Sequence, residues 1–110
     1  MKDDKLYLIH ILECIEKINS YTSSGETEFL NSTLLQDAVF RNFEIIGEAT
    51  KNLSLDFRER YPEIPWRKMA GLRDVLIHNY MGVDARLVWN IVKNDLPDLE
   101  RNIRIILKDM

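Results

Sequence analysis

Hydrophobic residues recur every three or four positions along much of this chain, and this spacing lines one face of a helix. The first run predicts a helix over about residues 4–20, with Asp3 or Asp4 as its N-terminal cap. Residues 20–32 have no sustained period and are rich in turn formers, so they predict a loop with room for one short turn. The apolar positions of the first helix are Leu8, Ile11, Leu12, Ile15 and Ile18.

A second helix is predicted from Thr33 to about Leu53. Thr33 and Gln36 have the spacing of a capping box, in which two side chains satisfy backbone amides at a helix start. Two apolar stripes on this helix indicate burial on two sides, and the second is too apolar to leave in water, so we expect a homodimer. The broad face comprises Leu35, Ala38, Val39, Ile45, Ile46 and Ala49, and the second stripe comprises Phe40, Phe43 and Gly47.

The rest of the chain predicts further helices. Residues 54–63 are polar and punctuated, and Pro65 suits the first position of a third helix, which Gly82 would end. Asp84 can cap the next helix. Pro97 must kink or restart that helix, and Asp95 can cap the restart.

No alternating strand, hairpin turn or internal repeat interrupts the helical pattern. We therefore predict an all-α fold, an up-and-down bundle of four to five helices, in a single domain over residues 1–110. A chain of 110 residues is long enough for one core and too short for two, which excludes a multidomain enzyme.

Composition and charge narrow the function classes. Hydrophobic residues make up 45% of the chain, which excludes a disordered protein. The net charge is −3, so there is no global basic field to hold nucleic acid, and a nucleic-acid site must be local. The middle segment alone is basic, and its cations form either a phosphate-binding surface or the solvated rim of a packed helix. These cations are Lys51, Arg58, Arg60, Arg67, Lys68 and Arg73.

The single cysteine, Cys14, cannot form an intrachain disulfide and fits a helix as a small buried hydrophobe. The N-terminal residues lack a signal-peptide core, and the sequence has no run of about 20 apolar residues to span a membrane. We expect a cytoplasmic protein with no membrane partner.

The segment Gly71–Tyr80 concentrates the candidate chemistry, because it holds Arg73, Asp74, His78 and Tyr80. An arginine offers a planar cation matched to phosphate, and a histidine moves a proton near neutral pH, which is the pair that metal-free phosphodiester cleavage would use. On a regular helix, however, Arg73 and His78 lie about 140° apart around the axis. Spacing alone favours a simple surface pair of Asp74 and His78, which are four positions apart.

Other polar residues have simpler interpretations. His10 lies near the apolar stripe of the first helix without a second ligand at metal-binding spacing, so we interpret it as a structural or surface residue. Glu44 and Glu48 are either paired carboxylates or an exposed acidic face that Arg41 or Lys51 would neutralise. No Walker or Rossmann glycine pattern is present, and we expect neither a metal nor a cofactor.

Two residue types are interpreted as packing features. Gly47 and Gly71 lie inside predicted helices, where lone glycines mark close helix approach rather than a phosphate loop. Trp66 and Trp89 fall in apolar helical surroundings and are interpreted as core aromatics rather than platforms for base stacking.

Four segments together resemble one family. The string Arg73-Asp74-x-x-x-His78-x-Tyr80 resembles the signature of HEPN-domain proteins, and its tyrosine is similar to the HepT branch. The likeness covers about residues 5–107 in the expected order. The other segments are residues 41–49, similar to the family's second helix, residues 64–72, similar to the lead-in to the motif, and residues 83–90, similar to the start of the last long helix.

The resemblance implies a HEPN fold, a homodimer whose two motif helices line a shared cleft, and metal-independent endoribonuclease activity toward RNA. It further implies a toxin held in check by a minimal, MntA-like nucleotidyltransferase antitoxin that transfers AMP to the motif tyrosine. Arg73 and His78 would be the catalytic pair, Asp74 the polar supporting position, and Tyr80 the modification site. The RNA 2′-hydroxyl would attack the adjacent phosphate while a histidine shuttles a proton and an arginine stabilises the developing charge.

A second interpretation keeps the motif without catalysis. The chain would then be a helical partner or nucleotide-binding subunit of a minimal nucleotidyltransferase. Basic residues beside the motif favour the ribonuclease. The division of acid and base roles does not follow from the sequence.

Overall fold

A computed structural model describes residues 3–78 and 82–110, and all regular structure in these residues is helical. The predicted all-α bundle is confirmed, with seven helices in the described residues rather than four to five. In chain order they are α1 (Asp4–Tyr21), α2 (Glu26–Leu30), α3 (Thr33–Asn52), α4 (Leu55–Arg60), α5 (Trp66–His78), α6 (Ala85–Asn94) and α7 (Leu96–Lys108).

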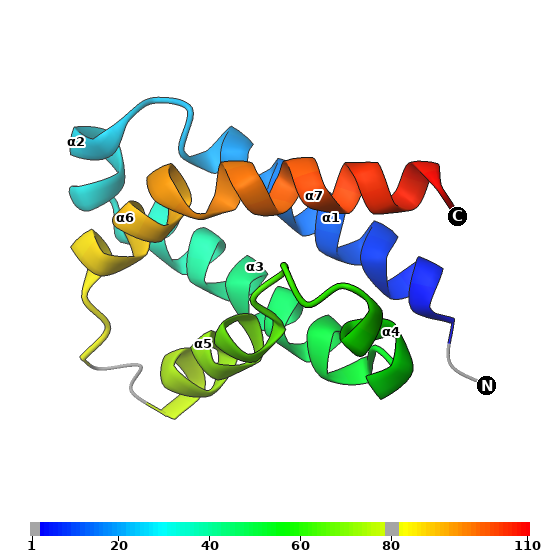
Figure 1. The fold of residues 1–110 in the computed structure, drawn as a ribbon. Coiled ribbons are helices and arrows are strands. Elements are labelled where there is room, and N and C mark those ends of the chain that lie inside the picture. Colours follow the sequence, from blue (N-terminus) through cyan, green and yellow to red (C-terminus); the bar gives the residue numbers. More distant parts are fainter. Residues whose placement is uncertain (1–2, 79–81) are drawn as a thin grey trace.

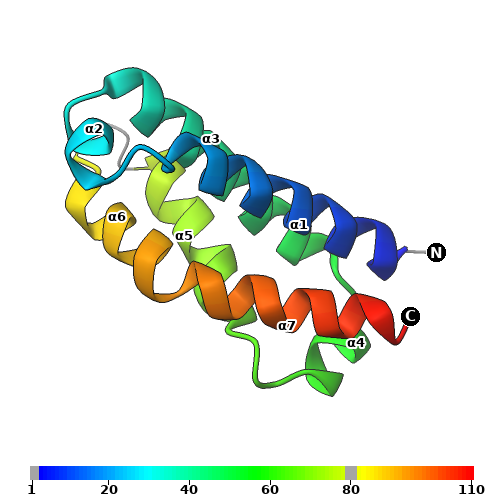
Figure 2. The same cartoon turned by 90° about the horizontal axis from the view of Figure 1, so that it is seen from above.

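The long helix α3 lies at the centre of the bundle and packs along both α1 and α5 (Figure 1). The C-terminal helix α7 packs against α1, and Figure 2 shows the start of α1 and the end of α7 at the same end of the molecule. The core comes from all seven helices and is mainly aliphatic. Burying this surface is the main force that holds the helices together.

The two apolar stripes of α3 are both covered inside the chain, which confirms burial on two sides. Phe43 and Gly47 of the second stripe are buried, and Phe40 is half-buried against the core. This stripe is therefore not the water-exposed surface from which we expected a homodimer, because α5 packs over it. The homodimer stays a prediction that needs a different surface.

The start of α3 differs from the predicted capping box. Ser32 is the N-cap, and its hydroxyl accepts a hydrogen bond from the amide of Leu35 at 3.1 Å. The Gln36 side chain instead donates to the carbonyl oxygens of Phe29 and Leu30, at 3.0 and 3.1 Å. The reason is that α2 ends just before α3 and leaves carbonyl groups that Gln36 satisfies.

Two short helices, α2 and α4, occupy segments for which the sequence predicts no helix. Residues 20–32 are predicted as a loop with room for one short turn, and residues 54–63 are described only as polar and punctuated. Each buries one phenylalanine against an aromatic neighbour. The ring centroid of Phe29 in α2 lies 5.6 Å from that of Trp89, and the centroid of Phe57 in α4 lies 6.0 Å from that of Trp66. Both tryptophans are buried, which confirms that they belong to the core.

The starts of α5, α6 and α7 follow the sequence within a residue or so. Helix α5 begins at Trp66, directly after Pro65. Asp84 caps α6 by accepting a hydrogen bond from the amide of Arg86 at 2.9 Å, as predicted. The helix restarts near Pro97, also as predicted, although Asp95 at the N-cap of α7 makes no side-chain cap bond.

Cys14 is buried in α1, as the sequence predicts. Burial raises the pKa of its thiol, while the nearby Lys17 acts in the opposite direction. The protonated thiol therefore behaves as a hydrophobic core residue. Within residues 3–78 and 82–110, no helix combines the length and hydrophobicity needed to cross a bilayer.

Candidate active site

Arg73 lies where α5 approaches α3 most closely around Gly47. A Cβ atom on Gly47 would lie 2.3 Å from the Cβ of Arg73 and 3.0 Å from the carbonyl oxygen of Met69. The absence of a side chain at this position lets the two helices meet, which confirms the packing role predicted for Gly47. The same prediction for Gly71 is wrong, because a Cβ there meets no atom within 4 Å.

The guanidinium of Arg73 is held by two carboxylates. Its Nε lies 2.7 Å from Glu48 on α3, and its Nη1 donates a hydrogen bond to Oδ1 of Asp74 at 3.1 Å. Lys51 donates to the same Asp74 oxygen at 2.8 Å. The carboxylates of Glu48 and Asp74 therefore orient Arg73. Because 29% of its side chain is exposed, Arg73 is still accessible to a ligand.

Asp74 carries a full negative charge in this network at neutral pH. The hydrogen bond from Lys51 lowers the pKa of the Asp74 carboxyl below its ordinary value, and the hydrogen bond and charge of Arg73 add to this effect. The ionised carboxylate of Asp74 contacts the guanidinium of Arg73 and can hold it in one orientation.

Glu44 and Glu48 have different partners. Arg41 pairs with Glu44 at 3.3 Å, as expected for neighbours on one helix. Glu48 pairs with Arg73 of α5 rather than with a cation of its own helix. These two carboxylates are therefore each neutralised by an arginine.

Arg73 lines a groove of about 400 Å³ between α1, α3 and α5. We call this the Arg73 groove. Two arginines, Arg41 and Arg73, line it with their glutamate partners. Helix α1 contributes Tyr7 and His10, so a histidine interpreted from the sequence as a structural or surface residue shares the groove with the motif arginine.

His78 occupies a different position from Arg73. It is the last residue of α5 and is exposed, and it is not among the described residues that line the Arg73 groove, whereas Ile77 is. This agrees with the wide angle between Arg73 and His78 expected on a helix. Tyr80, the predicted modification site, lies outside the described residues.

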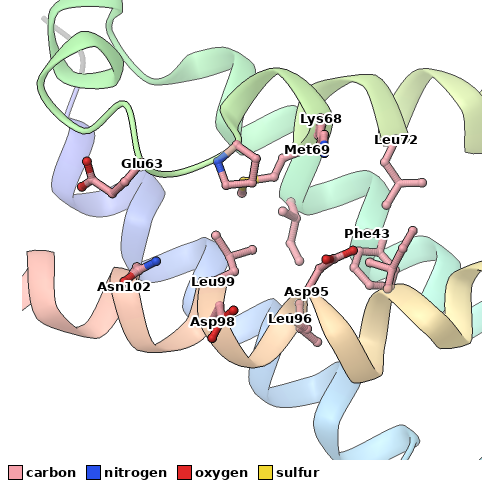
Figure 3. Close-up of a pocket in the computed structure, with 13 residues that line it drawn as sticks. Phe43, Glu63, Lys68, Met69, Leu72, Asp95, Leu96, Asp98, Leu99 and Asn102 are labelled. Atoms are coloured by element: carbon pink, nitrogen blue, oxygen red, sulfur yellow. The ribbon is translucent and has the colours of Figure 1, made fainter.

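A larger cavity of about 530 Å³ lies between α3, α5, α6 and α7. In Figure 3, apolar side chains such as Phe43, Leu72 and Leu99 surround it, together with the carboxylates of Asp95 and Asp98. Carboxylates outnumber cations among the described residues of its wall, so its charge does not favour an RNA phosphate. The motif residues Arg73, Asp74 and His78 are absent from this wall.

Sequence reasoning missed two members of the Arg73 site. Glu48 and His10 come from helices far from the motif in the chain, so their proximity to Arg73 depends on how α1, α3 and α5 pack. The one available signal was the three-residue spacing of Tyr7 and His10, which places them on the same face of α1. In the part of the chain that the structure describes, no cluster of three or more His, Cys, Asp or Glu residues could hold a metal ion.

Comparisons with known proteins identify relatives along nearly the whole chain. A family model described as ribonuclease HepT-like matches residues 11–106. A Methanocaldococcus jannaschii protein, whose name joins a gamma-glutamylcyclotransferase to a candidate RNase, is 52% identical over 110 residues, which are 99% of this chain and 50% of that protein. The chain thus spans about half the length of that relative.

Two further relatives match over most of their own length. The probable ribonuclease HepT of Thermococcus cleftensis is 50% identical over 100 residues, covering 90% of this chain and 91% of that protein. The mRNA nuclease HepT of Shewanella oneidensis is 25% identical over 120 aligned positions, covering 87% of this chain and 90% of that protein. No solved structure matches the chain.

Proposed function

This chain belongs to the HepT-like ribonuclease family, and from that premise we propose that it is, as one HEPN-like domain, an endoribonuclease toxin that cleaves RNA without a metal ion. The observation that carries this proposal is the half-buried Arg73, oriented by Glu48 and Asp74 at the wall of a groove. A fixed planar cation in such a place suits a phosphate and its transition state.

In the proposed reaction, the RNA 2′-hydroxyl attacks the adjacent phosphorus and the bond to O5′ breaks. Arg73 stabilises the extra negative charge on the phosphate oxygens. His78 transfers a proton, and its exposure at the end of α5 leaves it open to substrate. Asp74 keeps the guanidinium of Arg73 oriented toward the groove.

The proposed regulation involves a minimal nucleotidyltransferase antitoxin that transfers AMP to Tyr80. Tyr80 is two residues beyond His78 in the sequence, and His78, the last residue of α5, is exposed. The added phosphate would pair with Arg73 and occupy the place of the RNA phosphate, which would silence the nuclease.

A second candidate function is that of a non-catalytic helical partner, or nucleotide-binding subunit, of a nucleotidyltransferase. One observation favours it: the charge of Arg73 is already matched by two carboxylates. In that case the Arg73 groove would bind a nucleotide or RNA phosphate without cleaving RNA.

We expect the purified chain to cleave RNA in the presence of EDTA. Arg73→Ala and His78→Ala should each lower the rate by about 10²-fold or more, because general acid–base catalysis and charge stabilisation each contribute on that scale. Arg73→Lys should restore only part of the rate, because an ammonium lacks the two-pronged contact with phosphate. Arg101→Ala, which removes an exposed cation on α7, is the matched control and should leave the rate unchanged.

Three results would contradict parts of the proposal. Cleavage that EDTA abolishes and magnesium restores would contradict the metal-independent reaction. RNA binding without cleavage by the wild-type chain would favour the non-catalytic partner. Equal labelling of wild type and Tyr80→Phe by the cognate nucleotidyltransferase and ATP, measured by intact mass, would show that Tyr80 is not the modified residue.

A further inference from the structure

The proposed reaction needs two proton transfers, and the motif of each chain supplies one histidine. A proton must leave the 2′-hydroxyl as the O2′–P bond forms, and a proton must reach O5′ as the P–O5′ bond breaks. The chain has two histidines, His10 and His78. His10 is the one that lines the Arg73 groove.

The position of His10 is fixed by the packing of α1. Leu8 and Ile11, on either side of it in sequence, are buried in the core. The start of α1 is also tied to the start of α4, because both carboxylate oxygens of Asp4 accept hydrogen bonds at 2.8 Å from the backbone amide and the hydroxyl of Ser54, the N-cap of α4. His10 is thus presented to the groove by a helix that is held at several points.

The groups that face His10 in the groove suit a phosphate. Its own helix contributes Tyr7, α3 contributes Arg41, Glu44 and Glu48, and α5 contributes Arg73. Each glutamate is already paired with an arginine, Glu44 with Arg41 and Glu48 with Arg73. His10, which is exposed, therefore shares the groove with two arginine–carboxylate pairs, and a phosphate bound by the arginines would lie in the same groove as His10.

We infer that His10 is a second catalytic residue of this site, and that the scissile RNA phosphate binds in the Arg73 groove. This inference rests on the proposed ribonuclease function and deepens it. One imidazole accepts the proton of the 2′-hydroxyl, and the other, in its protonated form, donates a proton to O5′. His10 carries out one transfer from within the groove. His78, which follows the groove residue Ile77 at the end of α5, carries out the other from outside the described groove wall. The products are a 2′,3′-cyclic phosphate and a 5′-hydroxyl.

The test uses the full chain with an RNA oligonucleotide, and the rate is followed from about pH 5 to 8, where imidazoles titrate. His10→Ala and His10→Gln should each lower kcat by about 10²-fold, with KM changed by less than about threefold. The pH profile of each variant should lose one of its two limbs, and His78→Ala should lose the other. Free imidazole in the buffer should restore part of the activity of His10→Ala.

Ile9→Ala is the matched control, because Ile9 is a partly exposed neighbour on α1 that is not among the described groove residues. It should retain the wild-type rate and pH profile. A 2′-deoxy analogue of the oligonucleotide, which cannot be cleaved, should bind His10→Ala and wild type with dissociation constants within about threefold.

Failure of the inference and failure of the proposed function give different results. If wild type cleaves RNA and the His10 variants keep a normal rate, the inference is wrong and the ribonuclease stands. If the His10 variants have a lowered rate but keep both limbs of the pH profile and are not rescued by imidazole, His10 has a structural role. That result would also overturn the inference. If wild type does not cleave RNA at all, both are wrong.

Discussion

Asp74 binds two cations through one oxygen, and this makes its charge important for the site. The hydrogen bond from Lys51 lowers the pKa of Asp74 in the folded protein. These contacts therefore stabilise the fold at pH values above the ordinary pKa of an aspartate, and the stabilisation is lost as the pH falls through the lower pKa of the folded state. From about pH 5 to 8, where histidines titrate, Asp74 stays ionised. The charge that orients Arg73 is therefore constant across this pH range.

We expect Asp74→Asn to lower the rate of RNA cleavage by about tenfold without changing the shape of its pH profile between about pH 5 and 8. The amide keeps the size of the side chain and loses the charge that holds Arg73. Steady-state rates across this range measure the effect. A profile that loses its acidic limb would mean that Asp74 itself transfers the proton, and the prediction would then be wrong.

The residues of the motif could be predicted from the sequence, whereas their partners could not. Arg73, Asp74 and His78 are recognisable because their types and spacing resemble a family signature. The pairing of Arg73 with Glu48 depends on the approach of α5 to α3, which no local pattern encodes. His10 joins the groove for the same reason, since α1 must first pack on α3.

At the scale of elements, periodicity predicted the long helices and missed the short ones. A helix of five or six residues completes too few turns to show a period, so α2 and α4 resemble loops. They form because Phe29 and Phe57 each find an aromatic neighbour in the core, and because Ser54 caps α4 by accepting a hydrogen bond from the amide of Phe57 at 3.1 Å. The formation of α2 and α4 therefore depends on tertiary contacts rather than on a local sequence pattern.

The contact between α3 and α5 can be tested with two glycines of opposite surroundings. Gly47→Ala should destabilise the protein by about 1–3 kcal/mol, because its Cβ would lie 2.3 Å from the Cβ of Arg73 and the helices must separate. Gly71→Ala, the matched control in the interior of α5, meets no atom within 4 Å and should stabilise by about 0.5–1 kcal/mol.

Urea unfolding measures both changes. Shifts of the midpoint in the same direction for the two variants would contradict the close approach at Gly47. Because the clash falls on Arg73, Gly47→Ala should also lower RNA cleavage while the protein is still folded, and Gly71→Ala should not.

At the scale of the whole molecule, a homodimer needs exposed apolar surface, and the motif helix α5 carries some of it. Helix α5 covers the second apolar stripe of α3 and itself exposes 47% of Val75 and 38% of Ile77. Both residues lie between Arg73 and the end of the motif helix. They are two positions apart and so lie about 160° apart around the helix, and one partner helix can pack on only one of them. A partner helix packed on Val75, the more exposed of the two, would bury apolar surface.

We therefore predict a homodimer in which the motif helices of two copies meet at Val75. Sedimentation at micromolar concentration should give a dimer for wild type and a monomer for Val75→Asp, because a carboxylate buried in an apolar contact without a partner is strongly unfavourable. Leu34→Asp is the matched control, since Leu34 is also exposed but lies at the start of α3, and it should remain dimeric. Val75→Asp should also lose RNA cleavage if the cleft between copies holds the substrate. A wild-type chain that sediments only as a monomer, yet cleaves RNA at full rate, would show that each copy carries a complete site, with His10 and His78 serving the same Arg73.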